Sequence, residues 1–529
     1  MPRVLVADKI SSEGVEILKK VADVDVKTSL GIDELITSIG CYDGLVVRSA
    51  TQVTTDVITA AKNLKIIGRA GVGVDNIDVP AATQHGIVVV NSPEGNTIAA
   101  AELTMALLLA LSRNIPVADS SMKQGKWDRN SYVGVEVYNK TLGIIGLGKI
   151  GREVAKRAQS FGMRVIAQDP YLSSEVSKKL GIQLVSLDEL LAQSDYISLH
   201  LPKTRDTEGL IGAEQISKMK DGIRIINVAR GGIIDEFALA EALKSGKVAG
   251  AAVDVYSTEP ISQDNPLLKA SNIITTPHLG ASTTEAQSKV AIDVAEQMVD
   301  YFTGKPPRAA VNIPPVSPEV MERIAPYLTL AERMGVFLTQ TAEGHFDSID
   351  VCYSGDVAQE ETNTITRAVL VGILRPMLSQ TVNFVNAPLI AEARDIKVTE
   401  SRTATFDDFT SLVNIRAKTS KGVREISGTI FGRNEMRIVR VDGYRMDLVP
   451  EGTMLFVPHE DKPGIIGQVG TILGNQGINI GGMHVGRDKI SKRAVMVLSV
   501  DSIVPDEIRQ KIMQMSGIES IRQISFDTN

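Results

Sequence analysis

The chain has 529 residues, which is too long for one hydrophobic core, and the usual size of domains predicts three or four of them. Its net charge of -7, from 56 basic and 63 acidic residues, argues against general binding of nucleic acid or of an anionic membrane. The two cysteines, Cys41 and Cys352, are too far apart in sequence to suggest a metal-ligand pair. We therefore expect free thiols in a reducing cytoplasm and no metal site.

The N-terminal region, residues 1–98, alternates short apolar runs with helix-like segments, and it begins with a strand rather than the apolar core of a signal peptide. This alternation predicts a parallel sheet with helices on both faces. Functional residues of such sheets lie in loops at the carboxyl ends of strands. The strands expected here are 4–7, 44–48, 64–67 and 87–90, and the loops of interest are 48–51, 69–76 and 91–96.

The stretch 141–169 carries the strongest motif of the chain. An apolar strand runs into a complete GxGxxG sequence at 146–151, and a helix and a second strand follow. Gly146 permits the tight turn, Gly148 lets the backbone approach a pyrophosphate, and Gly151 lets helix and strand pack closely. Asp169 is placed to accept hydrogen bonds from an adenosine ribose, which favours NAD over NADP. An ordinary glycine turn is the alternative, but the complete strand–helix–acid context favours dinucleotide binding.

Three polar residues follow later strand ends in the same region: Arg230, Glu259 and His278. A hydroxy-acid dehydrogenase needs such a set. Histidine can take the hydroxyl proton near neutral pH, and a carboxylate can hold its other ring nitrogen. A guanidinium can bind the carboxylate of the substrate in a fork. Each residue alone has an ordinary structural explanation, but their joint position after the glycine motif predicts an active site.

The composition changes after a predicted helix at 287–302. Five of the 21 prolines lie between 306 and 318, which indicates a linker. Residues 319–450 mix helices with alternating strands and show no catalytic constellation, and residues 452–529 fit a βαββαβ pattern. The apolar helix expected at 103–112 is too short to span a bilayer and is better explained as buried, so no membrane partner is expected.

These motifs resemble the D-isomer-specific 2-hydroxyacid dehydrogenases over residues 1–315. The resemblance rests on 146–151, on Asn227–Gly232, on Asp254 with Glu259 and Pro260, and on 277–280. It implies an α/β fold with a doubly wound parallel-sheet NAD-binding Rossmann domain at 99–286. It also implies a discontinuous flavodoxin-like substrate-binding domain, formed by 1–98 and completed by 287–315.

The loops 48–51 and 71–76 and the long C-terminal extension resemble the long members of this family. Those members oxidise 3-phosphoglycerate to 3-phosphohydroxypyruvate with NAD, in the first step of L-serine biosynthesis. The resemblance gives Arg230 the role of binding substrate, His278 that of acid/base and Glu259 that of its partner. Substrate contacts are expected from Arg48, Ser49, Arg69, Gly71, Gly73, Asn96 and Arg129. Cofactor contacts are expected from Gly146, Gly148, Lys149, Ile150, Gly151, Asp169, Leu201, Val228, Asp254 and Ala281.

The C-terminal region, 452–529, resembles a regulatory ACT domain with a ferredoxin-like fold, and 316–451 resembles the α+β intervening domain of the long forms. The resemblance implies L-serine as an effector, bound between paired domains by His459, Asp461 and Asn479. A structural module used only for oligomerisation is the alternative. Apolar helices at 99–111 suit a homodimer interface, and paired ACT domains would extend it to a homotetramer.

Three alternatives stay open at this point. A glycerate or hydroxypyruvate reductase would use the same scaffold, although the additional arginines and the 214 residues after 315 (529 minus 315) argue against it. An NAD-sensing binding protein would also use this fold, although the Arg230, Glu259 and His278 set argues against it. Arg129, which the family resemblance assigns to the site of a neighbouring subunit, has the alternative of a solvated surface charge.

Overall fold

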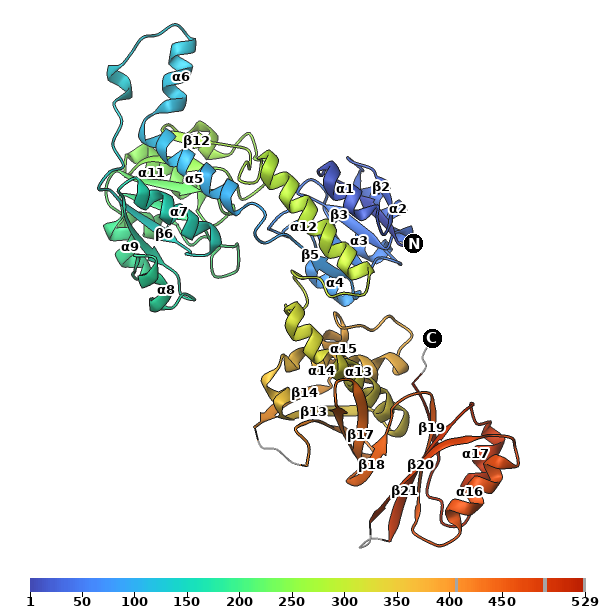
Figure 1. Ribbon diagram of the computed structural model, residues 1–529. Coiled ribbons are helices and arrows are strands. Elements are labelled where there is room, and N and C mark those ends of the chain that lie inside the picture. The colour runs from blue at the N-terminus through green and yellow to red at the C-terminus, as the bar shows by residue number, and fades with distance from the viewer. Residues whose placement is uncertain (405–407, 489–491, 527–529) are drawn as a thin grey trace.

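The computed structural model describes residues 1–404, 408–488 and 492–526. Four sheets succeed one another along the chain, and each has its own covering helices (Figure 1). The two sheets of the N-terminal half are joined by the long helix α12, and the two of the C-terminal half lie next to each other. The domain boundaries set above stay predictions, but the predicted fold class is confirmed.

The first sheet is parallel throughout and has the strand order β2-β1-β3-β4-β5, the flavodoxin-like order. Its outer strand β2 was not anticipated from the sequence, because its Asp-Val-Asp-Val sequence lies at the sheet edge and is only partly buried. The strands are β1 (Arg3–Val6), β2 (Asp23–Val26), β3 (Gly44–Val47), β4 (Ile66–Arg69) and β5 (Val88–Val90), and the helices are α1 (Ser12–Leu18), α2 (Ile32–Ser38), α3 (Thr55–Ala60) and α4 (Val79–Gln84).

Helix α12 (Thr284–Phe302) brings a distant part of the chain back to this first sheet. It packs on α1, where a Cβ at Gly14 would lie only 2.9 Å from the carbonyl oxygen of Ala291. It also packs on β4, where Gly68 faces Val294 and Met298. Close packing therefore requires glycine at both positions. After α12, an isolated β-bridge joins Ala310 to Val90 of β5. The domain around the first sheet is therefore completed by a segment that follows the second sheet in sequence.

The second sheet has seven parallel strands in the order β12-β11-β10-β9-β6-β7-β8. Strand β6 lies between β7 and β9, so the order of strands reverses there, and ligands of doubly wound sheets bind outside the carboxyl ends at such a point. The strands are β6 (Thr141–Ile145), β7 (Arg164–Gln168), β8 (Gln183–Leu184), β9 (Tyr196–Leu199), β10 (Ile223–Asn227), β11 (Val248–Val253) and β12 (Ile273–Thr275). The helices are α5 (Thr97–Ser112), α7 (Lys149–Ser160), α8 (Ser174–Lys179), α9 (Leu187–Gln193), α10 (Ala213–Lys218) and α11 (Glu236–Ser245).

Helix α6 (Ile115–Lys123) and the segment after it form an arm that projects from the second sheet (Figure 1). The arm exposes several large apolar side chains: Ile115, Val117, Met122, Trp127, Val133 and Tyr138. Of the described helices, none by itself has the length and apolar composition needed to cross a membrane. The α5–α6 pair, bent by 65°, meets those two criteria only when both helices are taken together.

The third sheet is mixed, with the order β14-β13-β15-β16-β17-β18 and one parallel pair, β13 with β14. Helices α13 and α14 share a buried core with it. The last hairpin of this sheet turns at Asp442 and Gly443, both in the left-handed region. The strands are β13 (Phe346–Gly355), β14 (Lys397–Thr403), β15 (Ser411–Thr419), β16 (Gly422–Phe431), β17 (Glu435–Val441) and β18 (Tyr444–Leu448), and the helices are α13 (Pro318–Thr341), α14 (Thr362–Leu374) and α15 (Ala387–Ala393).

The fourth sheet is antiparallel, with the order β20-β21-β19-β22, and it has the predicted βαββαβ chain order. Both helices share a core with one face of the sheet. The other face packs on α13, where the rings of Phe337 and Phe456 meet edge to face at 5.8 Å. The elements are β19 (Thr453–Glu460), α16 (Ile465–Gly474), β20 (Ile480–Asp488), β21 (Arg493–Val500), α17 (Asp506–Met513) and β22 (Arg522–Ser525). Short 3-10 turns elsewhere are η1 (Ile39–Cys41), η2 (Asn130–Tyr132), η3 (Pro266–Lys269), η4 (Asp356–Gln359) and η5 (Arg375–Met377).

Candidate active site

The glycine loop at the end of β6 has the shape that a pyrophosphate requires. Gly146 has a φ of +92°, and a Cβ there would lie 2.5 Å from the carbonyl oxygen of His200. A Cβ at Gly151 would collide with the carbonyl oxygen of Gly146, whereas no described atom lies within 4 Å of a Cβ at Gly148. Helix α7 begins directly after Gly148 without a side-chain cap. Its first N–H groups and its dipole are therefore available to an anion.

Asp169 follows β7 and ties the end of that strand to the glycine loop. Its Oδ2 accepts a hydrogen bond from the N–H of Leu147 at 2.8 Å, and its Oδ1 accepts one from the N–H of Tyr171 at 2.9 Å. Leu201 adjoins the same loop, since its Cδ2 would lie 2.8 Å from a Cβ on Gly146. These residues fit the adenosine end of a dinucleotide. Ile150 is half-buried in the first turn of α7, Val228 is buried after β10, and Ala281 is half-buried after the β12 loop.

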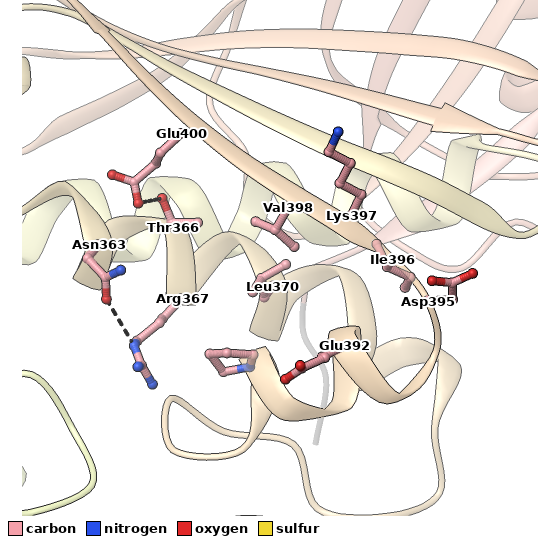
Figure 2. Close-up of a pocket in the computed structure, with 11 residues that line it drawn as sticks. Asn363, Thr366, Arg367, Leu370, Glu392, Asp395, Ile396, Lys397, Val398 and Glu400 are labelled. Atoms are coloured by element: carbon pink, nitrogen blue, oxygen red, sulfur yellow. Dashed lines mark hydrogen bonds between the residues drawn. The ribbon is translucent and has the colours of Figure 1, made fainter. Parts of the chain in front are cut away.

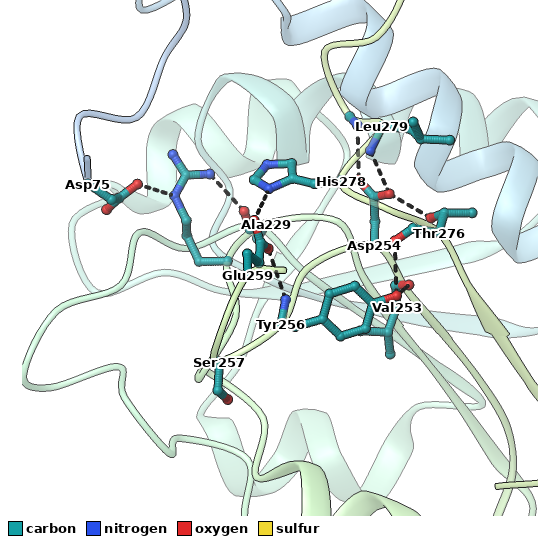
Figure 3. Close-up of polar contacts among 12 residues, drawn as sticks. Asp75, Ala229, Val253, Asp254, Tyr256, Ser257, Glu259, Thr276, His278 and Leu279 are labelled. Atoms are coloured by element: carbon teal, nitrogen blue, oxygen red, sulfur yellow. Dashed lines mark hydrogen bonds and ion pairs between the residues drawn. The ribbon is translucent and has the colours of Figure 1, made fainter. Parts of the chain in front are cut away.

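His278 and Glu259 meet after two neighbouring strands of the second sheet (Figure 3). Nδ1 of His278 lies 2.7 Å from Oε2 of Glu259, and Oε1 of Glu259 accepts a hydrogen bond from the N–H of Tyr256 at 3.0 Å. Burial acts to raise the pKa of Glu259, but the hydrogen bonds from His278 and Tyr256 prevail and lower it. Glu259 is therefore an ionised partner for one nitrogen of the imidazole, and Nε2 is left for a substrate.

Asp254 fixes the loop that carries His278. Its carboxylate is fully buried and accepts hydrogen bonds from Thr276 Oγ1 at 2.6 Å and from the N–H groups of Leu279 and Gly280 at 2.7 and 2.9 Å. Burial raises the pKa of the Asp254 carboxyl, although these hydrogen bonds act in the opposite direction. His278 itself has a φ of +55°, a left-handed conformation that these bonds stabilise. A direct contact of Asp254 with the cofactor stays a prediction.

Arg230 joins the two N-terminal sheets through a contact with the loop after β4. Its Nε donates to Oδ2 of Asp75 at 3.1 Å, and its Nη1 donates to the carbonyl oxygen of Ala229 at 2.7 Å (Figure 3). A Cβ at Gly73 would collide with Nη2 of Arg230, which explains why glycine occupies this loop position. The predicted substrate loop 69–76 and the predicted active-site arginine are therefore in direct contact.

Two further arginines lie on the substrate side of this contact. The side chain of Arg69 is largely buried and folds over Gly71, where a Cβ would collide with Arg69 Nη1. Burial, together with the positive charge of Arg230, lowers the pKa of Arg69 to about 10. The backbone N–H of Arg48 donates to Asp8 at 2.5 Å, which fixes the loop. Among the described residues, its guanidinium makes one hydrogen bond, from Nη1 to the Lys9 carbonyl at 3.3 Å.

The loop after β5 provides a second contact between the two domains. Lys149, in the glycine loop, forms an ion pair of 2.7 Å with Oε1 of Glu94. In the same loop, the side-chain oxygens Ser92 Oγ and Asn96 Oδ1 are buried and have no hydrogen-bond partner among the described residues. The predicted substrate residue Asn96 therefore keeps an oxygen that can accept a hydrogen bond. The predicted residue Ser49 is exposed after β3.

The other predicted site residues lie away from Arg230, Glu259 and His278. Arg129 is exposed on the projecting arm. In the C-terminal domain, His459 is buried and its Nδ1 contacts the carbonyl oxygen of Val457, whereas Oδ2 of Asp461 pairs with Arg487 at 2.7 Å. Asn479 instead binds Asp501.

Strand pairing places Asn479 and Asp461 at opposite ends of the fourth sheet. Ile480 and Thr453 both pair with Val500, whereas Asp488 and Glu460 both pair with Arg493. Asn479 precedes Ile480 and Asp461 follows Glu460. A single chain therefore does not bring the three predicted effector residues together.

Sequence reasoning missed the acids Asp75 and Glu94. Both stand in loops that were singled out, but acidic loop residues are common and no local signal gives their partners. Arg230 is 155 residues from Asp75, and Lys149 is 55 residues from Glu94. Only the folded arrangement of two domains brings these pairs together. Among the described residues, no group of three or more His, Cys, Asp and Glu is placed to hold a metal ion.

The second sheet, its glycine loop and the Glu259–His278 pair define an NAD-binding dehydrogenase of D-2-hydroxy acids. Residues 105–280 match the family of the D-isomer specific 2-hydroxyacid dehydrogenase NAD binding domain. Similar solved structures include a glyoxylate reductase from Paecilomyes thermophila, with a TM-score of 0.54 and 34% identity over 59% of this chain and 99% of that one. A D-lactate dehydrogenase from Aquifex aeolicus, complexed with NAD and lactic acid, has a TM-score of 0.52 and 29% identity over 57% of this chain and 96% of that one.

The chain belongs to the D-3-phosphoglycerate dehydrogenase family, and NAD is its cofactor. Residues 323–442 match the D-3-phosphoglycerate dehydrogenase intervening domain and residues 453–517 the ACT domain. A D-3-phosphoglycerate dehydrogenase of Synechocystis is 49% identical over 98% of this chain and 94% of the relative. The corresponding protein of Archaeoglobus fulgidus is 48% identical over 98% of both chains. The predicted family, including its intervening and ACT domains, is confirmed.

Proposed function

We propose that the protein oxidises 3-phospho-D-glycerate to 3-phosphohydroxypyruvate with NAD, the first step of L-serine biosynthesis. The observation that carries this proposal is the arrangement of side chains in Figure 3, where a Glu259–His278 pair faces the contact of Arg230 with the substrate loop. The relatives that share nearly the full length of the chain have the same activity in their names. The reductase and sensor alternatives receive no comparable support.

His278 acts as the base. Because Glu259 engages Nδ1, the ring presents Nε2 to the C2 hydroxyl, and this nitrogen accepts the hydroxyl proton. The carboxylate of Glu259 stabilises the imidazolium that results, and Asp254 holds the loop in place. NAD, when bound along the glycine loop and Asp169, supplies the acceptor for the hydride that leaves C2. The proton and the hydride together account for the two hydrogens that the alcohol loses.

Arg230 binds the substrate carboxylate and the C2 oxygen. Its Nε and Nη1 are held by Asp75 and Ala229, so Nη2 is the nitrogen left to face a substrate oxygen. The phosphate of the substrate requires more than one cation. Arg48 directly follows β3 and Arg69 ends β4, and the charges of Arg48 and Arg230 both act on Arg69. Three neighbouring arginines, whose charges act on one another, favour a substrate with two anionic groups.

The assembly is proposed to be a homodimer or a homotetramer. Large apolar side chains such as Trp127 and Val133 are 78% and 79% exposed on the projecting arm, and a second copy of the chain would cover them. This pairing would also carry Arg129 to the active site of the partner subunit. Pairing of the C-terminal domains would extend a dimer to a tetramer.

L-Serine is proposed to inhibit the enzyme at the ACT domain. Since Asp461 and Asn479 lie at opposite ends of one sheet, a ligand that contacts both needs two copies related by a two-fold axis. His459 and the start of helix α16 lie at the Asp461 end, where the first N–H groups of the helix can bind a carboxylate. Serine would therefore bind between paired domains and stabilise one arrangement of them.

The experiment follows NADH absorbance with purified protein and NAD. 3-Phospho-D-glycerate and D-glycerate are compared at equal concentration, each with and without L-serine. We expect turnover of the phosphorylated substrate only, reduced by serine. Equal turnover of D-glycerate would favour a glycerate dehydrogenase, and NAD binding without any turnover would favour a sensor. If serine does not change the turnover, the catalytic proposal stands, but L-serine is not an effector of this enzyme.

A further inference from the structure

The intervening domain contains a cavity of about 580 Å³ between α14, α15 and the edge strand β14. Volumes of this size are typical of small-molecule sites. Its apolar wall includes Leu370 and Val398, and charged side chains surround it (Figure 2). It lies in a different domain from the Glu259–His278 pair and is formed by elements that the catalytic mechanism does not use.

Arg367 is the cation best placed in this cavity. Its Nε donates to Oδ1 of Asn363 at 3.2 Å, and its Nη1 donates to the carbonyl oxygen of Phe384 at 2.8 Å. Burial lowers the pKa of Arg367. Within the described residues its third nitrogen, Nη2, makes no hydrogen bond. The guanidinium is thus held in place by two protein acceptors and keeps one donor group for a ligand.

The acids of the cavity are not paired with this arginine. Glu392 forms neither an ion pair nor a side-chain hydrogen bond among the described residues, although it lines the same cavity as Arg367. Figure 2 shows both side chains in the lower part of the view, with Lys397 pointing away from them. Glu400 is already engaged by Thr362 and Thr366 at 2.6 and 2.9 Å. Glu392 is therefore an unpaired acid, among the described residues, that lines the same cavity as the partly free Arg367.

The charges of the lining restrict the chemistry of a ligand. Two basic residues, Arg367 and Lys397, are outnumbered by Glu392, Asp395 and Glu400, so a polyanion such as phosphate is disfavoured. The described residues offer no group of three or more metal-ligating side chains here, which disfavours a divalent cation. A small molecule with one carboxylate and one ammonium group can bind Arg367 and Glu392 at once.

We infer that this cavity is an effector site for a free α-amino acid, whose carboxylate binds Arg367 and whose ammonium group binds Glu392. The apolar wall then receives the amino-acid side chain. This inference is independent of the serine site proposed for the ACT domain, since it concerns a different domain and different residues.

The cavity is connected to the substrate-binding part of the molecule through Arg367. Phe384, whose carbonyl Arg367 holds, precedes Val385, which is buried in the core of the first sheet. In the same loop, Nδ2 of Asn383 donates to the carbonyl oxygen of Gly86 at 2.7 Å, and Asn386 contacts that of Gln84. These carbonyls directly precede β5 and the loop that carries Glu94 and Asn96. A ligand that binds Arg367 therefore affects the contact between the intervening domain and the domain of the first sheet.

The test measures binding to the full-length protein carrying Asn479→Ala, which is intended to remove the serine site. Each proteinogenic L-amino acid is titrated by calorimetry. We expect at least one to bind, and its N-acetyl and carboxamide derivatives not to bind because each lacks one of the two charges. Glu392→Gln should weaken binding by at least about tenfold, since a charge-assisted contact is lost. The control Glu322→Gln changes an exposed acid of α13 and should bind like the parent.

A second measurement shows whether the site acts on the catalytic half. Hydrogen exchange of the backbone amides at 84–90 should change when the amino acid binds, and this change should be absent in Glu392→Gln. Turnover without amino acid should be the same in both proteins, which verifies that the variant folds. Failure of all amino acids to bind, unaltered binding to Glu392→Gln, or binding without any change at 84–90 would each overturn the inference.

Discussion

Nδ1 of His278 lies 2.7 Å from Oε2 of Glu259, and the same carboxylate is held by the backbone N–H of Tyr256 through its other oxygen. The histidine therefore has a fixed partner for one nitrogen, while its left-handed backbone is held by the loop around Asp254. Because Glu259 occupies Nδ1, Nε2 is the ring nitrogen of His278 that can act on a substrate. The predictions for Glu259 follow directly from it.

Replacing Glu259 by Gln should lower kcat by roughly 10- to 100-fold, the effect expected from losing a hydrogen bond to a charged group. Glutamine can still accept a bond from Nδ1, so orientation is partly kept, but the charge that stabilises the imidazolium is lost. Steady-state kinetics with 3-phospho-D-glycerate measure the effect. Glu241→Gln, at an exposed acid of α11, is the matched control and should retain the wild-type kcat. An unchanged kcat in Glu259→Gln would remove this residue from the mechanism.

The same pair predicts a dependence of stability on pH. The folded pKa of Glu259 lies below its ordinary value of about 4.3, so the ionised form favours the folded state. Its contribution should be fully present above that value and should be lost as the pH falls through the lowered folded pKa. The thermal midpoint of the wild type minus that of Glu259→Gln should therefore shrink towards acidic pH. A difference that stays constant from neutral to acidic pH would contradict the lowered pKa.

Arg48→Met should raise the KM for 3-phospho-D-glycerate by about tenfold or more, with a smaller effect on kcat. In the described part of the chain, the Arg48 guanidinium makes a single long hydrogen bond, at 3.3 Å, so the substitution should not disturb the fold. Losing one charged hydrogen bond to the phosphate accounts for the magnitude. Arg205→Met, at an exposed position of the second domain, is the control. If both variants show the wild-type KM, Arg48 does not bind the phosphate.

Glu94→Gln should tighten NAD binding by about two- to fivefold, the range expected for one exposed ion pair. Glu94 pairs with Lys149 at 2.7 Å in the glycine loop, so it competes with a pyrophosphate for this lysine and adds a negative charge near it. Fluorescence titration with NADH measures the dissociation constant. Lys149→Met should weaken binding instead. Weaker binding in Glu94→Gln would indicate that the ion pair supports the bound state.

Local patterns predicted much of the catalytic half. The run from Thr141 to Asp169 folds as strand, glycine loop, helix and strand because each step follows from residue types close in sequence. The same reasoning placed Arg230, Glu259 and His278 after strand ends, and the structure brings Glu259 and His278 into contact.

The remaining features depend on tertiary arrangement. The Arg230–Asp75 and Lys149–Glu94 pairs form only when two domains face each other. Helix α13 begins at Pro318, at the end of the proline-rich linker, and continues through Pro326 because its packing outweighs the lost hydrogen bond. The positions of Asp461 and Asn479 at opposite ends of a sheet follow from strand pairing, which residue types alone do not give.

The most direct test compares wild type and His278→Ala for oxidation of 3-phospho-D-glycerate, with the NAD dissociation constant measured on the same two preparations. A positioned acid/base contributes roughly 10²–10⁴-fold to the rate, so we predict a fall in kcat of that size with NAD binding nearly unchanged. That result would establish His278 as the group that accepts the hydroxyl proton. A rate close to that of the wild type, with NAD bound equally well, would contradict the account.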